Sequence, residues 1–152
     1  MKQIVPTTEE HILELSKTMR QADKDEVWAS NHKNPYDALR QGWLLSPETF
    51  TGLLDGHVVC IFGVAQNSLL SEDGVPWLLT SDLIHKAAYT FLRVNKVYVN
   101  EIRKKYKKLE NYVDCRNKMA IRWLSWLGFE MDKPQPYGPD NVMFRRFEYR
   151  RP

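Results

Sequence analysis

The alternation of apolar and polar positions divides the chain into short strands and amphipathic helices. Patterns rich in β-branched and aromatic residues, typical of strands, cover residues 2–6, 49–54, 57–65, 75–80 and 142–149. Apolar residues recurring three and four apart, typical of helices, cover residues 7–20, 35–45 and 117–127. Strands and helices interspersed in this way predict an α/β fold.

A hairpin is the clearest local feature of the first half. Asp55-Gly56 separates the apolar runs 49–54 and 57–65, and this dipeptide between two such runs is a strong hairpin signal. The second run, V-V-C-I-F-G-V, is almost entirely apolar. We therefore expect its strand to be covered on both faces.

The longest helical pattern follows the strand at 75–80. Thr80, Ser81 and Asp82 have side chains suited to cap a helix, and an apolar face continues to about Leu109. A polar stretch from Arg93 to Lys96 predicts a division into a short helix and a longer one. Two other polar segments complete the chain: residues 21–34 predict a short helix and a loop, and residues 133–141 a Pro/Gly loop.

The segment 110–131 reads as a strand, a polar turn, a helix and a second strand. Tyr112 and Val113 have strand character, and Asn117 is expected to cap the helix through its side-chain oxygen. Gly128 supplies the left-handed residue that ends a helix, after which Phe129 returns to the core.

Composition fits one folded domain over residues 1–152. Apolar residues make up 43% of the chain and charged residues 27%, which is typical of a globular protein. Lys and Arg number 22 against 19 Asp and Glu, and a net charge of +3 alone is too small to indicate nucleic-acid binding. No apolar run approaches the ~20 residues of a membrane span, and there is no apolar signal sequence.

The cysteine and histidine pattern predicts no metal site. Cys60 and Cys115 each lie in an apolar run, with no CxxC spacing, and read as buried free thiols that favour a reducing compartment. The four histidines are scattered along the chain, away from any such pair.

The segment 110–131 resembles the last motif of the GNAT-fold N-acetyltransferases, a strand followed by N-x-x-A-x-x-h-Y-x-x-x-G-F, where h is apolar. Asn117, Ala120, Gly128 and Phe129 match this spacing, while Leu124 replaces the tyrosine. The opening strand followed by P-T-T-E-E and a helix, and the hairpin with its later glycine, are two further resemblances. They imply a mixed, mostly antiparallel sheet of six to seven strands flanked by helices. The alternative is a generic strand–helix–strand unit.

Three features of this family are missing. Its turn after the strand at 75–80 is glycine-rich and holds the coenzyme A diphosphate on backbone N–H groups, whereas T-S-D-L-I-H-K-A-A has no glycine and adds the anion Asp82. Leu124 cannot replace the tyrosine that protonates the leaving thiolate. The strand 75–80 has no Glu to act as base. We therefore predict no catalytic residue and no cofactor. If acetyl-CoA does bind, the resemblance implies that Thr80, Ser81 and Asn117 contact it.

A narrower resemblance concerns the second half of the chain. W-L-L-T-S-D at 77–82, Y-K-K-L-E-N-Y-V at 106–113 and N-K-M-A-I-R-W-L at 117–124 are similar to segments of the small internal virion proteins of short-tailed phages. This resemblance implies a non-catalytic GNAT-like protein that acts in virion assembly, or as an internal or ejected virion component. Its expected location is the virion or the host cytoplasm, and its expected partners are other virion proteins or a host protein.

Two further functions stay open. One is an acetyl-CoA-dependent N-acetyltransferase with an altered phosphate loop, and the other a nucleic-acid-binding accessory protein. The candidate partner-binding residues are Lys104, Lys108, Trp126, Arg150 and Arg151. The structural alternatives are a solvated lysine face on the long helix and a charged edge strand that resists aggregation.

Overall fold

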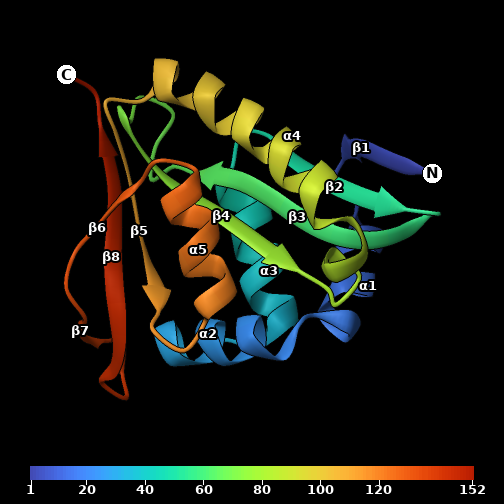
Figure 1. Ribbon diagram of the computed structural model, residues 1–152, viewed down its shortest axis with the longest axis horizontal. Helices are drawn as coiled ribbons and strands as arrows, with labels where there is room; N and C mark the ends of the chain where they lie inside the picture. Colours follow the sequence, from blue (N-terminus) through green and yellow to red (C-terminus); the bar gives the residue numbers. More distant parts are fainter.

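A computed structural model describes all 152 residues, as an eight-stranded sheet with helices on both faces (Figure 1). The strands are β1 (Lys2–Pro6), β2 (Thr49–Leu54), β3 (His57–Ala65), β4 (Asp73–Thr80), β5 (Lys108–Asp114), β6 (Glu130–Met131), β7 (Gln135–Tyr137) and β8 (Val142–Arg150). The helices are α1 (Glu9–Thr18), α2 (Gln21–Asn31), α3 (Pro35–Leu45), α4 (Ile84–Lys105) and α5 (Lys118–Trp126).

The strand order is β1-β2-β3-β4-β5-β8-β6, with β7 also pairing with β8. Only β4 and β5 are parallel; the other neighbouring strands are antiparallel. The predicted mixed, mostly antiparallel sheet flanked by helices is confirmed, with one strand more than expected. The additional short strand, β7, lies in the predicted loop 133–141.

The hairpin and its covered second strand are also confirmed. Asp55 and Gly56 both have positive φ, 51° and 82°, as a two-residue hairpin turn requires. On β3, Ile61 packs with the α1 and α3 side chains, and Phe62 packs with those of α4. Both faces of β3 are therefore buried, which explains its unbroken apolar sequence.

Helix α4 differs from its prediction at three points. It starts at Ile84 and is kinked at Ala87 (φ −141°, ψ 20°), so the predicted division into a short helix and a longer one lies there and not at 93–96. Arg93 is exposed, while buried Phe91 and Asn95 continue the inner stripe past it. Arg93 therefore marks the outer face of the longer helix.

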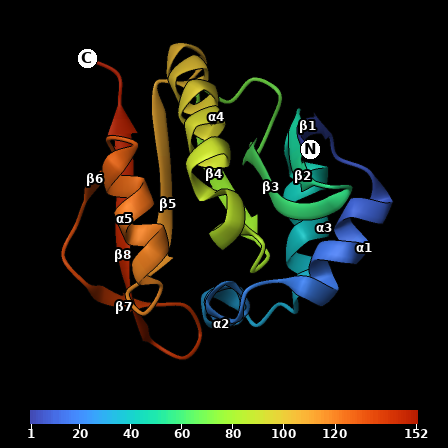
Figure 2. The ribbon, with the colours of Figure 1, turned by 45° about the vertical axis from the view of Figure 1, so that its right-hand side comes forward.

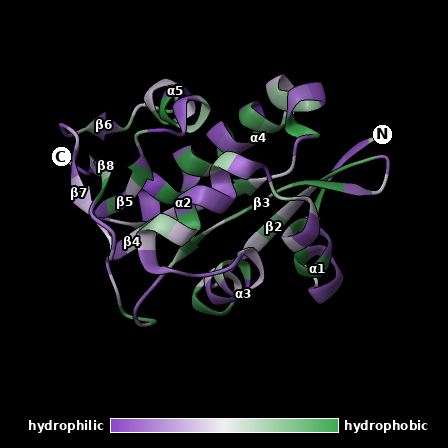
Figure 3. Ribbon diagram, turned by 90° about the horizontal axis from the view of Figure 1, so that it is seen from below, coloured by the Kyte–Doolittle hydropathy of each residue, from purple (hydrophilic) through white to green (hydrophobic).

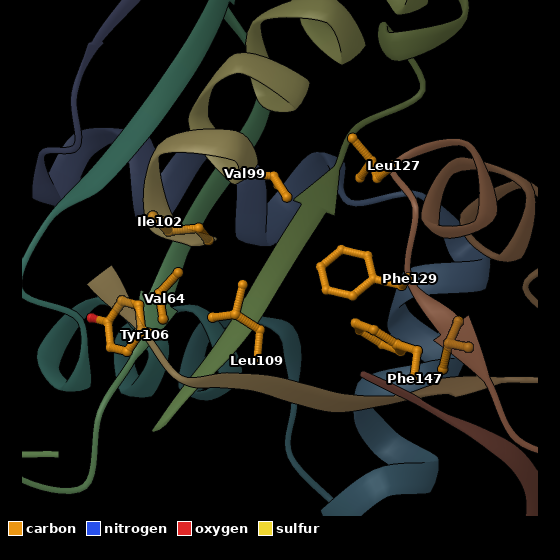
Figure 4. Close-up of a cluster of buried hydrophobic side chains, with 9 residues drawn as sticks. Val64, Val99, Ile102, Tyr106, Leu109, Leu127, Phe129 and Phe147 are labelled. Atoms are coloured by element: carbon orange, nitrogen blue, oxygen red, sulfur yellow. The ribbon is translucent and has the colours of Figure 1, made fainter. Parts of the chain in front are cut away.

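The end of α4 was predicted too late. The helix ends at Lys105 and β5 begins at Lys108, where Leu109 pairs with Tyr149 of β8. Leu109 is fully buried in a cluster with Val99, Ile102 and Tyr106, near the edge-to-face pair Phe129 and Phe147 (Figure 4). The apolar Leu109 fits the periodicity of the helix before it and that of the strand after it. Its pairing with β8 makes it part of the strand.

Helix α2 is more extensive than the sequence pattern suggested. It has eleven residues and ends at His32, which adopts a left-handed conformation (φ 56°). Figure 2 shows α2 end-on at the bottom, between the half that contains β5 and α5 and the half that contains α1 and α3. This placement puts α2 below the junction of β4 and β5.

Candidate ligand cleft

Strands β4 and β5 separate along their length and leave a cleft between them. Their pairing is limited to Asp73 with Lys108 and Gly74 with Leu109. Beyond these pairs is a cavity of about 380 Å³, which lies in the range of small-molecule sites, ~300–1,000 Å³. Its lining residues come from α2 and α3 on one face of the sheet and from α4 and α5 on the other. The cleft therefore passes between the two helical layers.

Gly74 allows the close approach at the narrow end. A Cβ atom at this position would lie 2.4 Å from Val64 Cγ1 and 3.1 Å from Tyr106 Cδ1. Any side chain here would push β4 away from the apolar cluster that joins it to β5. The narrow end is thus fixed by apolar packing.

The wide end exposes the backbone edge of β4. Ser81 N–H donates to Val59 O of β3, so alternate residues 76, 78 and 80 direct their C=O groups toward β5, and Leu78 and Thr80 direct their N–H groups there too. At residues 76 and 80 these backbone groups are already hydrogen-bonded, to side chains and to the backbone before α2. Asn111 Nδ2 donates to Pro76 O (2.9 Å), Thr80 N–H donates to Asp23 Oδ2 (2.9 Å), and Thr80 O accepts from Arg20 N–H.

Leu78 is the remaining residue of this edge. By the same alternation its N–H and C=O face the cleft, and it lies beyond the two residues of β4 that pair with β5. Leu78 also lines the cavity. Its amide group is therefore a donor and an acceptor available to an extended ligand.

Two carboxylates of α2 replace the missing strand pairing at the wide end. Asp23 accepts from both the backbone N–H and the hydroxyl of Thr80 on β4 (2.9 and 2.8 Å). Three residues on, Glu26 Oε1 accepts from Asp114 N–H on β5 (2.9 Å). Each strand end thus bonds to α2 instead of to the other strand.

Arg20 and Asn117 complete this polar group. Arg20 donates to Asp23 Oδ1 and to Asn117 Oδ1, both at 2.9 Å, and Asn117 Nδ2 donates to Asp23 Oδ1 (3.0 Å). The expected helix-capping role of Asn117 is wrong, because its side chain makes no cap bond to α5. Asn117 is fully buried, and bonding to Asp23 and Arg20 satisfies both ends of its amide.

Glu26 has the most altered acidity at this site. Burial of its carboxyl, and next the nearby charge of Asp23, raise its pKa to about 8. Hydrogen bonds from Asp114 N–H and Asn117 oppose the rise but do not cancel it. Both of these bonds end on Oε1, so Oε2 is free to carry the proton.

Most backbone N–H groups in and after the turn between β4 and α4 donate to neighbouring residues of the chain. Leu83 N–H donates to Ser81 Oγ (3.3 Å). The N–H groups of Ile84, His85 and Lys86 donate to the carbonyls of Ser81, Asp82 and Leu83, at 3.0–3.2 Å. The turn has three residues, no glycine and no positive φ. These amides therefore do not form the cradle that a diphosphate needs.

The predicted cap at Thr80–Asp82 is only partly right. The N-cap residue of α4 is Leu83, which makes no side-chain cap bond. The Ser81 hydroxyl accepts from Leu83 N–H and donates to Val58 O. The Thr80 hydroxyl donates to Asp23 of α2. Of the three predicted cofactor contacts, Thr80 and Asn117 lie together around Asp23 and Arg20, whereas the Ser81 hydroxyl bonds β3.

Leu124 lines the cleft at the position of the family tyrosine. Phenols nearby come from other elements: Tyr112 and Tyr137 stack at 4.0 Å between ring centroids, and Tyr98 reaches the cleft from α4. Burial raises the pKa of both Tyr98 and Tyr137, so these phenols hold their protons tightly.

The cleft has little positive charge. Its charged lining residues are Arg20, Asp23 and Glu26, and Arg20 is already paired with Asp23 at 2.9 Å. Their positions were not predicted, because residues 21–34 were expected to form only a short helix and a loop. The signal in the sequence was the three-residue spacing of Asp23 and Glu26, which puts both carboxylates on one face of a helix.

The predicted partner-binding residues are divided between two places. Lys108, Arg150 and Arg151 surround one polar pocket at the end of the sheet. Lys108 pairs with Glu110, Arg150 with Glu148, and Arg151 donates to Lys104 O. Lys104 pairs with Glu101, and Trp126 lies apart on α5, 46% exposed.

Two absences complete the description. None of the helices combines the length and the apolar character that crossing a bilayer requires. No three His, Cys, Asp or Glu side chains are grouped so as to hold a metal ion.

Sequence comparison identifies no relative: no family model matches the chain, and no curated sequence matches it significantly. The fold, however, matches solved acetyltransferases over nearly the whole chain. An N-acetyltransferase from Staphylococcus aureus Mu50 superposes with a TM-score of 0.73 at 10% identity, covering 99% of this chain and 98% of that one. A ribosomal-protein-alanine N-acetyltransferase from Brucella melitensis gives 0.72 at 12% identity, covering 98% and 99%.

A third structure contains its cofactor. The putative acetyltransferase yncA from Salmonella typhimurium, solved with acetyl-CoA, gives a TM-score of 0.71 at 10% identity and covers 98% of this chain and 93% of that one. Identities this low establish architecture and not activity. The chain has the GNAT fold.

Proposed function

We propose that this chain is a non-catalytic GNAT-fold protein that acts in the assembly of a short-tailed phage particle, or as an internal or ejected component of one. The observation that carries the non-catalytic part is the turn between β4 and α4. The N–H groups of residues 83–86 donate to residues 81–83 and Ser81 N–H donates to β3, so a coenzyme diphosphate finds few free N–H groups and no glycine there. The exposed Asp82 adds a negative charge to the same turn.

The charge of the cleft supports the same conclusion. Coenzyme A is a polyanion, whereas the cleft offers one arginine that is already paired with Asp23, and a second carboxyl group at Glu26. Like charges in a site with little water repel each other more strongly than they do in solvent. A neutral extended ligand would not meet this penalty.

The phage part of the proposal rests on sequence resemblance. The three segments at 77–82, 106–113 and 117–124 carry that resemblance. Two of them supply Thr80 and Asn117, the partners of the α2 carboxylates. The similar segments therefore include residues that hold the wide end of the cleft.

The non-catalytic part is tested by titration calorimetry with acetyl-CoA and with coenzyme A. We expect no binding at micromolar concentration. Leu124→Tyr, which restores the phenol of the family motif, is expected to gain neither binding nor acetyl transfer to peptide amines. Micromolar binding by the wild-type chain would overturn this part.

The assembly role is tested by deleting the gene from the phage that encodes the chain. We expect particles that lack part of their internal structure and do not infect, with rescue by a plasmid copy. Normal infectivity of the deletion phage would overturn the assembly role, whatever the calorimetry shows.

An acetyl-CoA-dependent N-acetyltransferase is the second candidate. The through-going cleft, with the backbone of Leu78 facing it, favours this function, and the similar solved structures favour it more than they favour a virion role. Here the chain would need a proton donor in place of Leu124, and Tyr98, Tyr112 and Tyr137 are the phenols that line the cleft. Transfer of labelled acetyl groups, lost in Tyr112→Phe or Tyr137→Phe, would establish it.

A further inference from the structure

Positive charge is concentrated on one face of the molecule. Helices α4 and α5 together contain eight Lys and Arg against one acidic residue, Glu101, a net charge of +7. The rest of the chain has fourteen Lys and Arg against eighteen Asp and Glu, a net charge of −4. Figure 3 shows α4 and α5 on one side of the sheet, with α1 and α3 on the other. The small overall charge therefore hides a strong asymmetry.

Most of these cations have no counterion within the protein. Of the eight, only Lys104 forms an ion pair, with Glu101 at 3.2 Å. Arginines elsewhere are commonly paired, as Arg40 is with Glu9 at 2.7 Å and Arg146 with Glu110 at 2.7 Å. Unpaired cations on one surface produce a potential that attracts an anionic partner.

The unpaired cations lie in two neighbouring rows. Lys118, Arg122 and Trp126 are four residues apart and exposed, so they share one face of α5. On α4, exposed Lys86 and Arg93 are seven residues apart. Lys96 joins the rows, because its Nζ lies 4.2 Å from the centre of the Trp126 ring. We call these six residues the α4–α5 surface.

We infer that the α4–α5 surface binds the phosphate backbone of duplex DNA. Lys96 lies about 12 Å along α4 from Ala88, Lys86 lies on the other side of the kink at Ala87, and the α5 row widens the surface. A single phosphate or diphosphate cannot reach cations so far apart, whereas duplex DNA presents a charge every ~1.7 Å of its axis. Lysine and arginine contacts to phosphates do not select a base sequence.

Apart from Trp126, this surface differs from the partner-binding residues that the sequence predicted. Arg150 is paired with Glu148, and Arg151 donates to a backbone carbonyl. Both are therefore partly satisfied within the protein, unlike Lys118 and Arg122. The inference does not depend on the proposed function, since it holds with or without a role in virion assembly.

The test is fluorescence anisotropy of a labelled 20-base-pair duplex, titrated with the full chain from 50 to 200 mM KCl. Five phosphate contacts predict a slope of log K against log salt of about −4.5. Lys118→Ala/Arg122→Ala should reduce the magnitude of the slope by about 2, equally for unrelated duplex sequences. Lys17→Ala/Lys24→Ala removes the same charge from α1 and α2, where neither lysine is paired, and should leave the slope unchanged.

Several results would overturn the inference. These are no DNA binding at 50 mM KCl, an equal loss in both double variants, or displacement of the duplex by acetyl-CoA, which would assign the cations to a cofactor. Polyglutamate binding as tightly as DNA would assign the surface to an acidic protein. Circular dichroism of each variant checks folding, and quenching of Trp126 fluorescence by DNA, absent in Trp126→Phe, reports contact with the surface directly.

Discussion

The two ends of the β4–β5 junction hold the same strands by opposite means. At the narrow end, strand pairing at Gly74 is packed against Val64, Tyr106 and Leu109. At the wide end, Asp23 and Glu26 of α2 accept the backbone N–H groups of Thr80 and Asp114. A sheet can thus be opened with the backbone groups at the ends of both strands still bonded, provided that side chains replace the missing strand, and only Leu78 of β4 keeps its groups open to the cleft.

The difference also separates the energetics of the two ends. Apolar packing is tolerant of pH and salt, whereas a buried carboxylate depends on its protonation state and on each of its partners. We therefore expect the wide end to respond to charge changes and the narrow end to volume changes.

Removal of Asp23 should have the largest effect. Asp23→Ala leaves Arg20, Thr80 and Asn117 without their shared acceptor in a buried site, and should lower the free energy of unfolding by ~3–5 kcal/mol. Urea denaturation measures the loss. Asp25→Ala, on the exposed side of the same helix, is the control and should change stability by less than ~0.5 kcal/mol. Equal effects would mean that α2 is not anchored through Asp23.

Glu26→Gln should stabilise the protein at high pH. The pKa of Glu26 is about 8 in the folded protein against a usual 4.5, so the folded state holds the proton more tightly. Its stabilisation is complete below about pH 4.5 and is lost as pH rises through 8. Glutamine keeps the acceptor atom of both hydrogen bonds and has no charge to lose.

Thermal denaturation from pH 5 to 9 follows this difference. At pH 9 the variant should exceed the wild type in unfolding free energy by on the order of a few kcal/mol, and at pH 5 by much less. A difference that does not vary with pH would show that Glu26 titrates normally.

Gly74→Ala tests the narrow end. The new methyl group meets Val64 Cγ1, and overpacking of this kind should cost ~1–3 kcal/mol. Val64→Ala creates space at the same point, so the double variant should recover part of the loss relative to Val64→Ala alone. Additive losses in a double-mutant cycle would mean that the contact does not limit this position.

The thiols should give the smallest effect. Burial raises the pKa of Cys60 to about 12, whereas Cys115, beyond β5 at the wide end, is only half-buried. Under native conditions a disulfide reagent should therefore modify one thiol per chain, and in denaturant two. Cys115→Ser should abolish the native reaction. Rapid modification of both thiols would show that β3 is accessible from solvent.

Local sequence determined much of the fold. Asp55-Gly56 specified its hairpin, the apolar run of β3 required cover on both faces, and the glycine after α5 ended that helix with φ 94°. Each of these depends on backbone preference or on burial of one segment. They could be predicted because both are short-range properties.

The absence of glycine from the segment after β4 was also visible in the sequence. The structure added that the N–H groups of residues 84–86 donate to carbonyls of residues 81–83. The excess of positive charge in α4 and α5 is also present in the sequence. These residues form one surface only because the two helices pack on the same side of the sheet.

Only the tertiary structure decided the cleft and its polar group. Arg20, Asp23 and Asn117 are more than 90 residues apart at the extremes, and no local pattern links them. The local sequence explained Asn117 as a helix cap, and the segment that forms α2 was expected to be only a short helix and a loop. Burial overrode both interpretations, because a polar side chain enclosed in the protein bonds to whichever partners the packing brings within reach.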